Sequence, residues 1–413
     1  MFKLLAILLL ATFVATEKAR FDHYKVFRVQ AKNENDLKLL RDVEDGNSFM
    51  FWDSAKNIGD FADIVVPPHK FDEIESLISR FGLKAKVMVN NLQDMVDSER
   101  IGKRDEPFGW EAYYPLETIY EWVANLSRKY PDVVSTFEIG KSYENRPILG
   151  VKISYKEGNK GIFIESNIHA REWITSATVT YLMNELLTST DPAVRDLAEN
   201  VDWYIIPVFN VDGFVYSHTS DRMWRKTRQP TSSLCYGTDA NRNFDFYWFQ
   251  GGASNNPCSE TYAGPNAFSE PETRALGAYF DSVSKNVSAF FSFHSYGQYF
   301  LYPFGSKQAP AINNEAEHIA VGEATVKRLA ERYGTKYRMG NTITTLYESS
   351  GITMDWIKGV YEIPFAFTYE FRDTGNYGFM LPADQIIPNG EEVLDSIVAF
   401  VEKCRELGYF PKN

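Results

Sequence analysis

Basic charge and long apolar runs are both scarce in this sequence. The 413 residues include 43 Lys and Arg against 55 Asp and Glu, a net charge of −12, and no long basic run occurs. Proteins that bind nucleic acid draw their affinity from clustered Lys and Arg, so we expect no nucleic-acid partner. No apolar run after the first residues approaches the roughly 20 residues that span a bilayer. We therefore expect no membrane association through the body of the chain.

Cysteine is also rare. The chain has three, Cys235, Cys258 and Cys404, so an oxidising compartment would leave at least one unpaired. Cys235 and Cys258 are close in sequence around a loop rich in Gly, Asn and Pro, and we expect the disulfide there. Cys404 lies in a helical pattern and is interpreted as a small buried apolar residue. The sequons at Asn125 and Asn286 are candidate glycan sites.

The amino terminus has the pattern of a secretory signal peptide over residues 1–16. Lys3 precedes an apolar stretch that is too short to span a bilayer, and small residues precede the polar Glu17. A membrane anchor is the alternative. The sequence therefore predicts a secreted, extracellular protein that is soluble once the signal peptide is removed.

Residues 17–104 are expected to form a small α+β domain of the split βαβ type. Strands and helices are predicted in the order strand, helix, strand, strand, helix, strand at residues 24–29, 35–43, 49–53, 60–66, 70–81 and 84–90. A polar connector compatible with a helix follows, over residues 91–102. Arg100, Lys103 and Arg104 are candidate cleavage points for a trypsin-like protease, and a solvated charge cluster is the alternative.

Residues 105–413 are expected to form one α/β domain with a mixed central sheet covered by helices on both faces. Pro271 and Gly390 are interpreted as helix start signals. Helices are predicted at residues 116–130, 173–187, 271–283, 315–331 and 391–406, and strands at 133–138, 148–154, 161–165, 203–209, 289–294 and 366–371. In such folds, functional residues collect beyond the ends of strands.

Two histidines and a carboxylate stand where predicted strands end. His169 and Glu172 follow the strand at 161–165, and His294 closes the strand at 289–294. Imidazole and carboxylate ligands suit zinc, and three protein ligands leave one coordination position open, as in catalytic zinc sites. The sequence therefore indicates a catalytic metal centre, with a core histidine as the alternative for His294.

The spacing of a histidine three residues before an acid is not specific by itself. It recurs at His69 with Asp72 and at His218 with Asp221. We interpret both of these as surface pairs.

A set of motifs resembles the zinc metallocarboxypeptidases of the pancreatic carboxypeptidase A/B type, over essentially the whole chain including an activation segment. The motifs are His169-Ala-Arg-Glu172-Trp-Ile, Trp224-Arg-Lys-Thr-Arg, Asp239-Ala-Asn-Arg-Asn, Phe293-His-Ser-Tyr and Thr368-Tyr-Glu-Phe-Arg-Asp-Thr-Gly-Asn-Tyr-Gly-Phe. The resemblance implies a carboxypeptidase-like fold after a pro-domain. It also implies one Zn²⁺ per chain, bound by His169, Glu172 and His294, with Asp239 orienting His169.

The resemblance also implies the residues that carry the reaction. Glu370 matches the general base, and Arg225 matches the arginine that stabilises the oxyanion. A carboxylate within the aromatic strand at 366–371 is costly to bury unpaired, which favours a function for Glu370. A buried ion pair with Arg372 is the alternative.

Substrate-binding residues follow from the same resemblance. A guanidinium bonds a carboxylate through two parallel N–H groups, so Arg242 suits a free chain end. The residues matched to the terminal carboxylate are Asn241, Arg242 and Tyr347, and those matched to more distant parts of the substrate are Arg171, Tyr296 and Phe379.

The pocket for the terminal side chain is interpreted from Met354, which matches the floor position that is acidic in relatives preferring Lys or Arg. An apolar floor cannot pair with a cation, so we expect a preference for hydrophobic C-terminal residues. Ile352 stands where the A-type pattern has Gly and is expected to narrow the pocket, and Glu348 adds a charge beside Tyr347. The family also places non-proline cis bonds at positions that map to Ser295-Tyr296, Pro303-Phe304 and Arg372-Asp373.

Taken together, the sequence predicts the secreted zymogen of a monomeric zinc carboxypeptidase. Its substrates would be the C-termini of peptides or proteins, and a trypsin-like protease would activate it. The alternative is a carboxypeptidase-fold binding protein without catalysis, which loss of a metal ligand or of the base would favour; it is disfavoured because each of those positions carries the expected residue type. A serine hydrolase is excluded because no Gly-x-Ser-x-Gly sequence is present.

Overall fold

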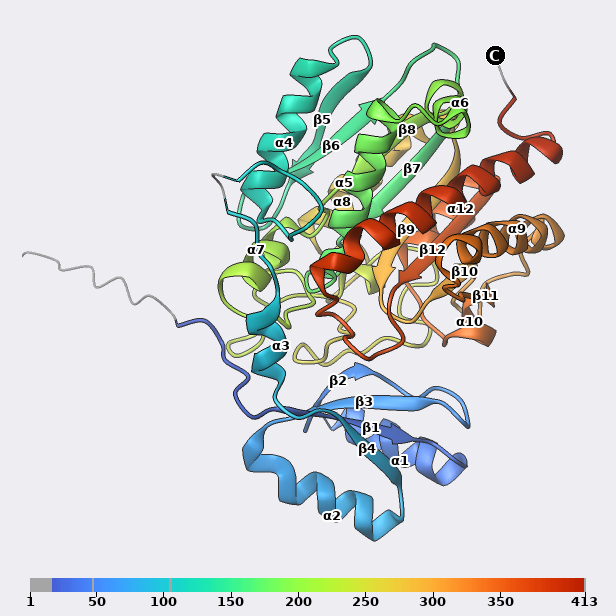
Figure 1. The fold of residues 1–413 in the computed structure, drawn as a ribbon. Helices are drawn as coiled ribbons and strands as arrows, with labels where there is room; N and C mark the ends of the chain where they lie inside the picture. Colours follow the sequence, from blue (N-terminus) through green and yellow to red (C-terminus); the bar gives the residue numbers. More distant parts are fainter. Residues whose placement is uncertain (1–16, 47, 104–105, 412–413) are drawn as a thin grey trace, which may run out of the picture.

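The structure is a computed structural model that describes residues 17–46, 48–103 and 106–411. Within these residues the chain forms a four-stranded sheet near its N-terminus and an eight-stranded sheet after it. Figure 1 shows the smaller sheet and its helices below the larger part of the molecule. The predicted signal peptide, residues 1–16, and the candidate cleavage point Arg104 lie outside the described residues.

The four-stranded sheet has the order β2-β3-β1-β4, with antiparallel neighbours. Its elements are β1 (Lys25–Gln30), α1 (Glu34–Asp45), β2 (Met50–Asp53), β3 (Phe61–Val66), α2 (Phe71–Phe81) and β4 (Lys84–Val89). The helices cover one face over a core that includes Val29 and Ile64. On the side of the larger part, Trp52 packs with Met223 and Phe379. The predicted split βαβ order is confirmed.

A short helix, α3 (Leu92–Ser98), leads from the small sheet into the larger part. Beyond it, the carbonyl of Arg100 accepts a hydrogen bond from the N–H of Tyr113 at 2.9 Å, and the N–H of Gly102 donates to the carbonyl of Tyr113 at 2.8 Å. A Cβ placed on Gly102 would lie 2.1 Å from the ring of Tyr114, so this close approach requires glycine. The backbone is therefore held on both sides of the bond between Arg100 and Ile101.

The eight-stranded sheet has the order β11-β10-β12-β9-β7-β8-β6-β5. Its strands are β5 (Val134–Lys141), β6 (Pro147–Ile153), β7 (Gly161–Ser166), β8 (Asp202–Ile206), β9 (Val287–Ser295), β10 (Tyr299–Tyr302), β11 (Arg338–Asn341) and β12 (Phe365–Phe371). The central strands β12, β9, β7 and β8 are parallel, whereas β10, β6 and β5 pair in antiparallel fashion with β12, β8 and β6. Every residue of β7 and β9 is buried, as in parallel strands covered on both faces. The predicted mixed sheet is confirmed.

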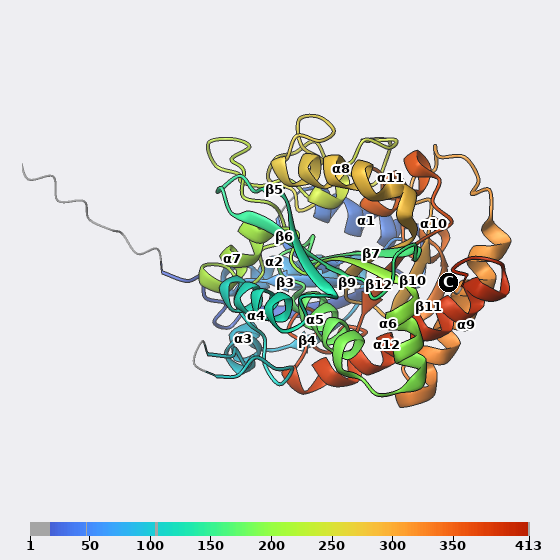
Figure 2. The same cartoon turned by 90° about the horizontal axis from the view of Figure 1, so that it is seen from above.

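Helices cover both faces of this sheet. They are α4 (Leu116–Lys129), α5 (Trp173–Thr188), α6 (Pro192–Asn200), α7 (Val211–Thr219), α8 (Pro271–Val283), α9 (Glu315–Tyr333), α10 (Thr342–Thr345), α11 (Thr353–Tyr361) and α12 (Ile386–Glu406). In Figure 2, α4, α5, α6 and α12 lie on one side of the sheet, and α8 and α11 lie on the other.

Three features of the larger part differ from the sequence prediction. Helix α12 begins at Ile386, so Gly390 lies inside it and does not start it. A Cβ placed on Gly390 would lie 2.5 Å from the ring of Tyr181, so glycine here permits α12 to pack closely on α5. Strand β8 ends at Ile206, and the short helices α6, α7 and α11 were not predicted.

Other local predictions agree with the structure. Cys235 and Cys258 form a disulfide, and Cys404 is a buried free cysteine. Among the helices of the described residues, none is both long enough and apolar enough to cross a bilayer. The peptide bonds in cis include those predicted: Ser295-Tyr296, Pro303-Phe304 and Arg372-Asp373.

Candidate metal centre and active site

The three predicted metal ligands lie at or just beyond the carboxyl ends of two neighbouring strands. β7 ends at Ser166, and the turn after it carries His169 and Glu172 to the start of α5. His294 is the next-to-last residue of β9, which pairs in parallel with β7. Parallel neighbours end at the same edge of a sheet, so two histidines 125 positions apart meet there.

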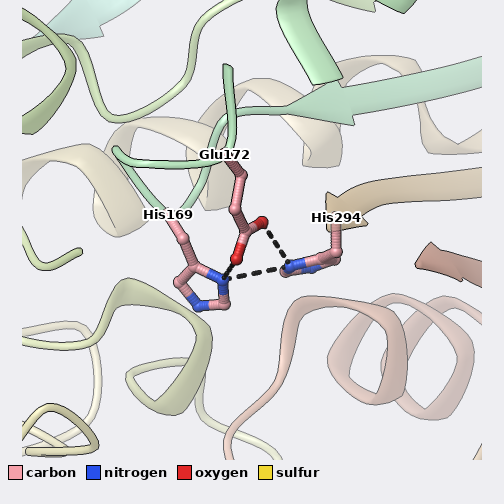
Figure 3. A group of neighbouring side chains, drawn as sticks. All are labelled: His169, Glu172 and His294. Carbon is pink, nitrogen blue, oxygen red and sulfur yellow. Dashed lines mark hydrogen bonds and ion pairs between the residues drawn. The ribbon is translucent and has the colours of Figure 1, made fainter. Parts of the chain in front are cut away.

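The nitrogen and oxygen atoms of these three side chains face one another (Figure 3). Nδ1 of His169 lies 2.8 Å from Oε1 of Glu172, and Nδ1 of His294 lies 3.3 Å from Oε2 of Glu172. The two Nδ1 atoms are 3.1 Å apart. All three side chains are buried, and their ligand atoms lie within 4.8 Å of one another. The predicted convergence of His169, Glu172 and His294 is confirmed.

The outer nitrogen of each imidazole also has a partner. Nε2 of His169 lies 3.2 Å from Oδ1 of Asp239, and Nε2 of His294 lies 2.9 Å from the hydroxyl of Ser292. An imidazole that carries its proton on Nε2 presents the lone pair of Nδ1 to a metal. Two such nitrogens and one carboxylate are a donor set that suits zinc, with room for a fourth ligand.

Electrostatics also favour a cation at this centre. Burial opposes a charge on His294, yet the carboxylate of Glu172 raises its pKa to about 9. Burial likewise opposes a charge on Asp239, yet Arg225 and His169 hold the pKa of Asp239 well below its usual range. The centre therefore presents carboxylate charge to whatever it binds, which is the condition that a divalent metal requires.

Glu370 faces the same edge of the sheet from the neighbouring strand. β12 pairs in parallel with β9, and Glu370 stands in register with His294. Burial raises the pKa of Glu370 to about 8, with His294 and Arg225 opposing that shift. Arg372, the alternative ion-pair partner of Glu370, binds Glu392 instead, with Nε 2.8 Å from Oε1.

A cavity of about 870 Å³ lies between the two sheets. Its walls include the side chains of Arg171, Arg225, Arg242 and Tyr347. One terminal nitrogen of Arg225 lies 4.0 Å from Oε1 of Glu172, so the cavity adjoins the metal centre. Six Lys or Arg residues and four Asp or Glu residues line the cavity, so the wall carries an excess of positive charge, which suits an anionic ligand.

Comparison with known proteins decides the family. Residues 119–396 match the family described as zinc carboxypeptidase, and residues 27–99 match the carboxypeptidase activation peptide. The chain belongs to the zinc carboxypeptidase family.

Individual relatives are similar to this chain over almost its whole length. Zinc carboxypeptidase A 1 of Anopheles gambiae is 42% identical over 417 residues, covering 99% of this chain and 96% of the relative. Carboxypeptidase A1 of Bos taurus is 36% identical and covers 94% of this chain and 95% of the relative. The crystal structure of thrombin activatable fibrinolysis inhibitor superposes with a TM-score of 0.85 at 29% identity, over 92% of this chain and 98% of that one. The structure of carboxypeptidase A from Helicoverpa armigera gives 0.83 at 27% identity, over 94% and 98%.

In this zinc carboxypeptidase, hydrogen bonds fix Arg242, at the cavity wall, and its neighbour Asn241, both of which are matched to carboxylate binding. Nε of Arg242 donates to the carbonyl of Gly252 at 2.8 Å, and one terminal nitrogen donates to the carbonyl of Asn241 at 2.7 Å. Oδ1 of Asn241 accepts from the N–H of Thr353 at 2.9 Å, which turns its Nδ2 toward His294. The remaining N–H groups of Arg242 are available to a ligand.

Arg225 shares its carboxylate partner with a metal ligand. Its terminal nitrogen lies 2.9 Å from Oδ2 of Asp239, while Oδ1 of Asp239 faces His169. One carboxylate therefore positions both the imidazole and the guanidinium.

The predicted pocket-floor residues are buried in the carboxypeptidase core. Met354 is 1% exposed, and the hydroxyl of Thr368 lies 3.5 Å from its sulfur. Ile352 is 5% exposed. The neighbouring Asp355 uses Oδ2 to accept a hydrogen bond from the N–H of Gly305 at 2.8 Å. One oxygen of this carboxylate is thus engaged by the backbone, whereas the buried Oδ1 has no hydrogen-bond partner among the described residues.

The other two histidine-acid pairs have different outcomes. His69 is exposed, in agreement with its interpretation as a surface residue. His218 is half-buried, and its ring stacks on Trp173 with centroids 3.8 Å apart. The interpretation of His218 as part of a surface pair is wrong, because α7 turns the ring toward α5.

The small sheet contacts residues matched to the substrate path. The hydroxyl of Tyr296 donates to Oδ2 of Asp63 at 3.2 Å, and Nε of Arg28 binds Oδ1 of Asp63 at 2.6 Å. The ring of Trp52 meets that of Phe379 edge to face, with centroids 5.9 Å apart. Sequence reasoning missed these contacts because no local pattern on β1, β2 or β3 marks the face that meets the catalytic part.

The connector is anchored by a buried ion pair that sequence reasoning also missed. The carboxylate of Glu99 binds the guanidinium of Arg222 through two contacts of 2.7 Å, and the two side chains are 2% and 1% exposed. Arg222 also donates to the carbonyls of Arg171 and Phe379 at 2.8 Å each. Its guanidinium lies 3.6 Å from the ring centroid of Trp173. The two partners are 123 positions apart, so no local signal joins them.

Proposed function

We propose that this protein is the secreted zymogen of a carboxypeptidase that removes hydrophobic C-terminal residues from peptides or proteins. The observation that carries the proposal is the convergence of two imidazoles and Glu172 next to a cavity whose wall contains Arg242. We assign residues 1–16 to a signal peptide, 17–104 to the activation domain and 105–413 to the catalytic domain.

The metal ligands and Glu370 divide the chemistry between them. Zinc held by His169, Glu172 and His294 would polarise the scissile carbonyl and acidify the attacking water. Glu370 accepts a proton from that water on its carboxylate and delivers it to the leaving amine. Arg225, held by Asp239, directs its remaining N–H groups at the oxygen on which negative charge develops.

Recognition of a free chain end rests on Arg242. Its position in the cavity wall and its unused N–H groups support a two-point bond to the terminal carboxylate. Asn241, whose carbonyl accepts from Arg242, and Tyr347, whose ring centroid lies 5.9 Å from the guanidinium, complete this set. Arg171, Tyr296 and Phe379 bind the more distant residues of the substrate.

Selection of the terminal side chain rests on Met354. An apolar side chain at the pocket floor offers no charge to a Lys or Arg, so hydrophobic side chains are favoured. Oδ2 of the neighbouring Asp355 already accepts the N–H groups of Gly305 and Ser306, so this oxygen is not offered to a cationic side chain. Ile352 reduces the width of the pocket and favours aliphatic side chains over large aromatic ones.

The activation domain keeps the enzyme inactive by covering the substrate path. Asp63 accepts a hydrogen bond from Tyr296, and Trp52 packs against Phe379. Nζ of Lys56 lies 5.0 Å from the ring centroid of Tyr347. A substrate cannot contact these residues while the small sheet is in place.

The backbone bonds around Arg100 bear on which bond the activating protease cuts. A protease must bind its substrate as an extended strand with free carbonyl and N–H groups. The carbonyl of Arg100 and the N–H of Gly102 both bond to Tyr113 in a distant segment, whereas the carbonyl of Lys103 accepts the N–H of Glu106, three residues on, at 3.1 Å. We assign the first cut to the dibasic Lys103-Arg104 and not to Arg100.

The proposal is tested with the full chain, before and after limited trypsin digestion. Release of the last residue is measured on matched peptides ending in Leu, Phe and Arg. We expect release only after nicking, fastest for Leu and slowest for Arg, with new N-termini after Lys103 or Arg104. Fast release of Arg would overturn the specificity, and full activity of the uncut chain would overturn the zymogen assignment. Absence of release from all three peptides would favour the binding protein.

A further inference from the structure

Glu165 is a carboxylate that the reaction described above does not use, although it lies deep in the same region. It occupies the next-to-last position of β7 and is 0% exposed. In the parallel register of β7 and β9, it stands opposite Ser292. The hydroxyl of Ser292 donates to Oε2 of Glu165 at 2.9 Å.

The same hydroxyl lies against a metal ligand. Oγ of Ser292 is 2.9 Å from Nε2 of His294, two residues along β9 and on the same face of the sheet. Glu165, Ser292 and His294 therefore form a continuous series of contacts that ends on the side of the imidazole away from the metal.

The chemistry of the metal centre fixes the direction of these hydrogen bonds. Nδ1 of His294 can bind a metal only through its lone pair, so Nε2 must carry the proton and donate it. Ser292 accepts this N–H, and its single O–H is then donated to Glu165. If the hydroxyl instead donated to Nε2, the proton of His294 would sit on Nδ1 and face the metal. An acceptor at Glu165 selects the first arrangement.

A neighbouring amide cannot replace Ser292 in this role. Nδ2 of Asn241 lies 3.3 Å from Nε2 of His294. Because Oδ1 of Asn241 accepts from the N–H of Thr353, the group facing the histidine is a donor and cannot accept its N–H. Ser292 is thus the acceptor that His294 has.

We propose that Ser292 and Glu165 act as a positioning relay that holds His294 in its metal-binding tautomer. The relay rests on the zinc site described above and does for His294 what Asp239 does directly for His169. Burying a carboxylate with a hydroxyl as its partner is unfavourable, which argues against a purely packing role for Glu165. Polar groups behind a metal ligand typically change metal affinity by about 10- to 100-fold when removed.

The relay is tested by zinc affinity, a property that does not depend on turnover. Full-length chains carrying Ser292→Ala, Glu165→Gln or both are loaded with zinc, and competition with a chromogenic chelator gives the dissociation constant. We expect Ser292→Ala to weaken zinc binding by about 10-fold or more and Glu165→Gln by several-fold. In a chain that already carries Ser292→Ala, Glu165→Gln should raise the zinc dissociation constant by less than about a further twofold, because its effect passes through the hydroxyl.

Two matched controls separate the relay from general damage to the core. Ser166→Ala removes a buried hydroxyl on β7, the strand that carries Glu165, and this hydroxyl donates to the carbonyl of Pro207 at 2.6 Å. Glu272→Gln alters another fully buried carboxylate, which accepts from the N–H of Tyr143. Both should leave zinc affinity within about twofold of the unaltered chain while lowering thermal stability.

Each outcome decides the proposal. If Ser292→Ala binds zinc as tightly as Ser166→Ala does, the relay is overturned. If Glu165→Gln weakens zinc binding equally in the unaltered chain and in the Ser292→Ala chain, Glu165 is not part of the relay. If Ser292→Ala does not fold, the isosteric Glu165→Gln against Glu272→Gln gives the same decision. An unaltered chain that binds no zinc would contradict the metal centre itself, which is a different failure.

Discussion

The four-stranded and eight-stranded sheets place their charged side chains differently. In the small sheet, Arg28 and Asp63 bind one another across strands and face outward to the catalytic part. In the large sheet, Glu370 and Glu165 are single carboxylates on buried strands. Glu370 stands in register with His294, and Glu165 stands opposite Ser292, two residues before His294. The small sheet therefore uses charge to contact a surface, whereas the large sheet gathers carboxylates around the metal centre.

The largest expected effect is on catalysis by the large sheet. Glu370→Gln keeps the shape of the side chain and removes its ability to take a proton, so kcat after trypsin digestion should fall by about 10²- to 10⁴-fold or more. Steady-state kinetics on a peptide ending in Leu measure this change. The fully buried Glu272 is the control, since Glu272→Gln should leave kcat close to that of the unaltered enzyme. Comparable rates for Glu370→Gln and the control would mean that Glu370 is not the base.

The next effect concerns the ion pair that joins the two regions. Glu99→Gln leaves the buried Arg222 without its anion, and loss of one partner of a buried pair lowers stability by about 3–5 kcal/mol. We expect a lower urea midpoint for the uncut chain and faster nicking by trypsin.

An exposed ion pair in the same activation domain is the control. Asp22 and Arg20 form such a pair, with side chains 47% and 60% exposed, and Asp22→Asn should not change the midpoint measurably. If both substitutions shift the midpoint equally, burial of the Glu99 pair has no special role in holding the activation domain.

A smaller effect is expected on the selection of substrates. Met354→Asp places a carboxylate at the pocket floor, and the ratio of kcat/KM for Arg over Leu should rise by about 10-fold or more. Ile352→Gly provides a matched change of shape without charge, and it should raise the rate for Phe relative to Leu without helping Arg. An unchanged Arg preference in an active Met354→Asp enzyme would place the selecting residue elsewhere.

Sequence reasoning recovered the parts of the molecule that depend on local periodicity. The strands and helices of the small sheet and the central strands β7, β9 and β12 follow directly from alternating or continuous apolar patterns. His169, Glu172 and His294 could be chosen because each stands next to the end of such a strand. Short helices of nine residues, such as α6 and α7, carry too few turns for a clear period.

The features that escaped prediction depend on contacts between distant segments. Gly390 was interpreted as a helix start, although its role is to admit the ring of Tyr181. The hydrogen bond between Ser292 and Glu165 requires the register of β7 and β9, which no single strand reveals. The binding of Glu99 to Arg222 requires the placement of one domain on the other. Local sequence thus predicts which elements form, and tertiary packing decides which polar groups meet.

The most direct test of the central claim measures zinc content and C-terminal release on the same sample. The full chain is dialysed, its zinc is counted, and a peptide ending in Leu is supplied before trypsin, after trypsin and after a chelator. We predict one zinc per chain, release that begins only after nicking, loss of release with the chelator and recovery when zinc is returned. A chain that binds no zinc, or one whose release of Leu is indifferent to the chelator, would contradict the account.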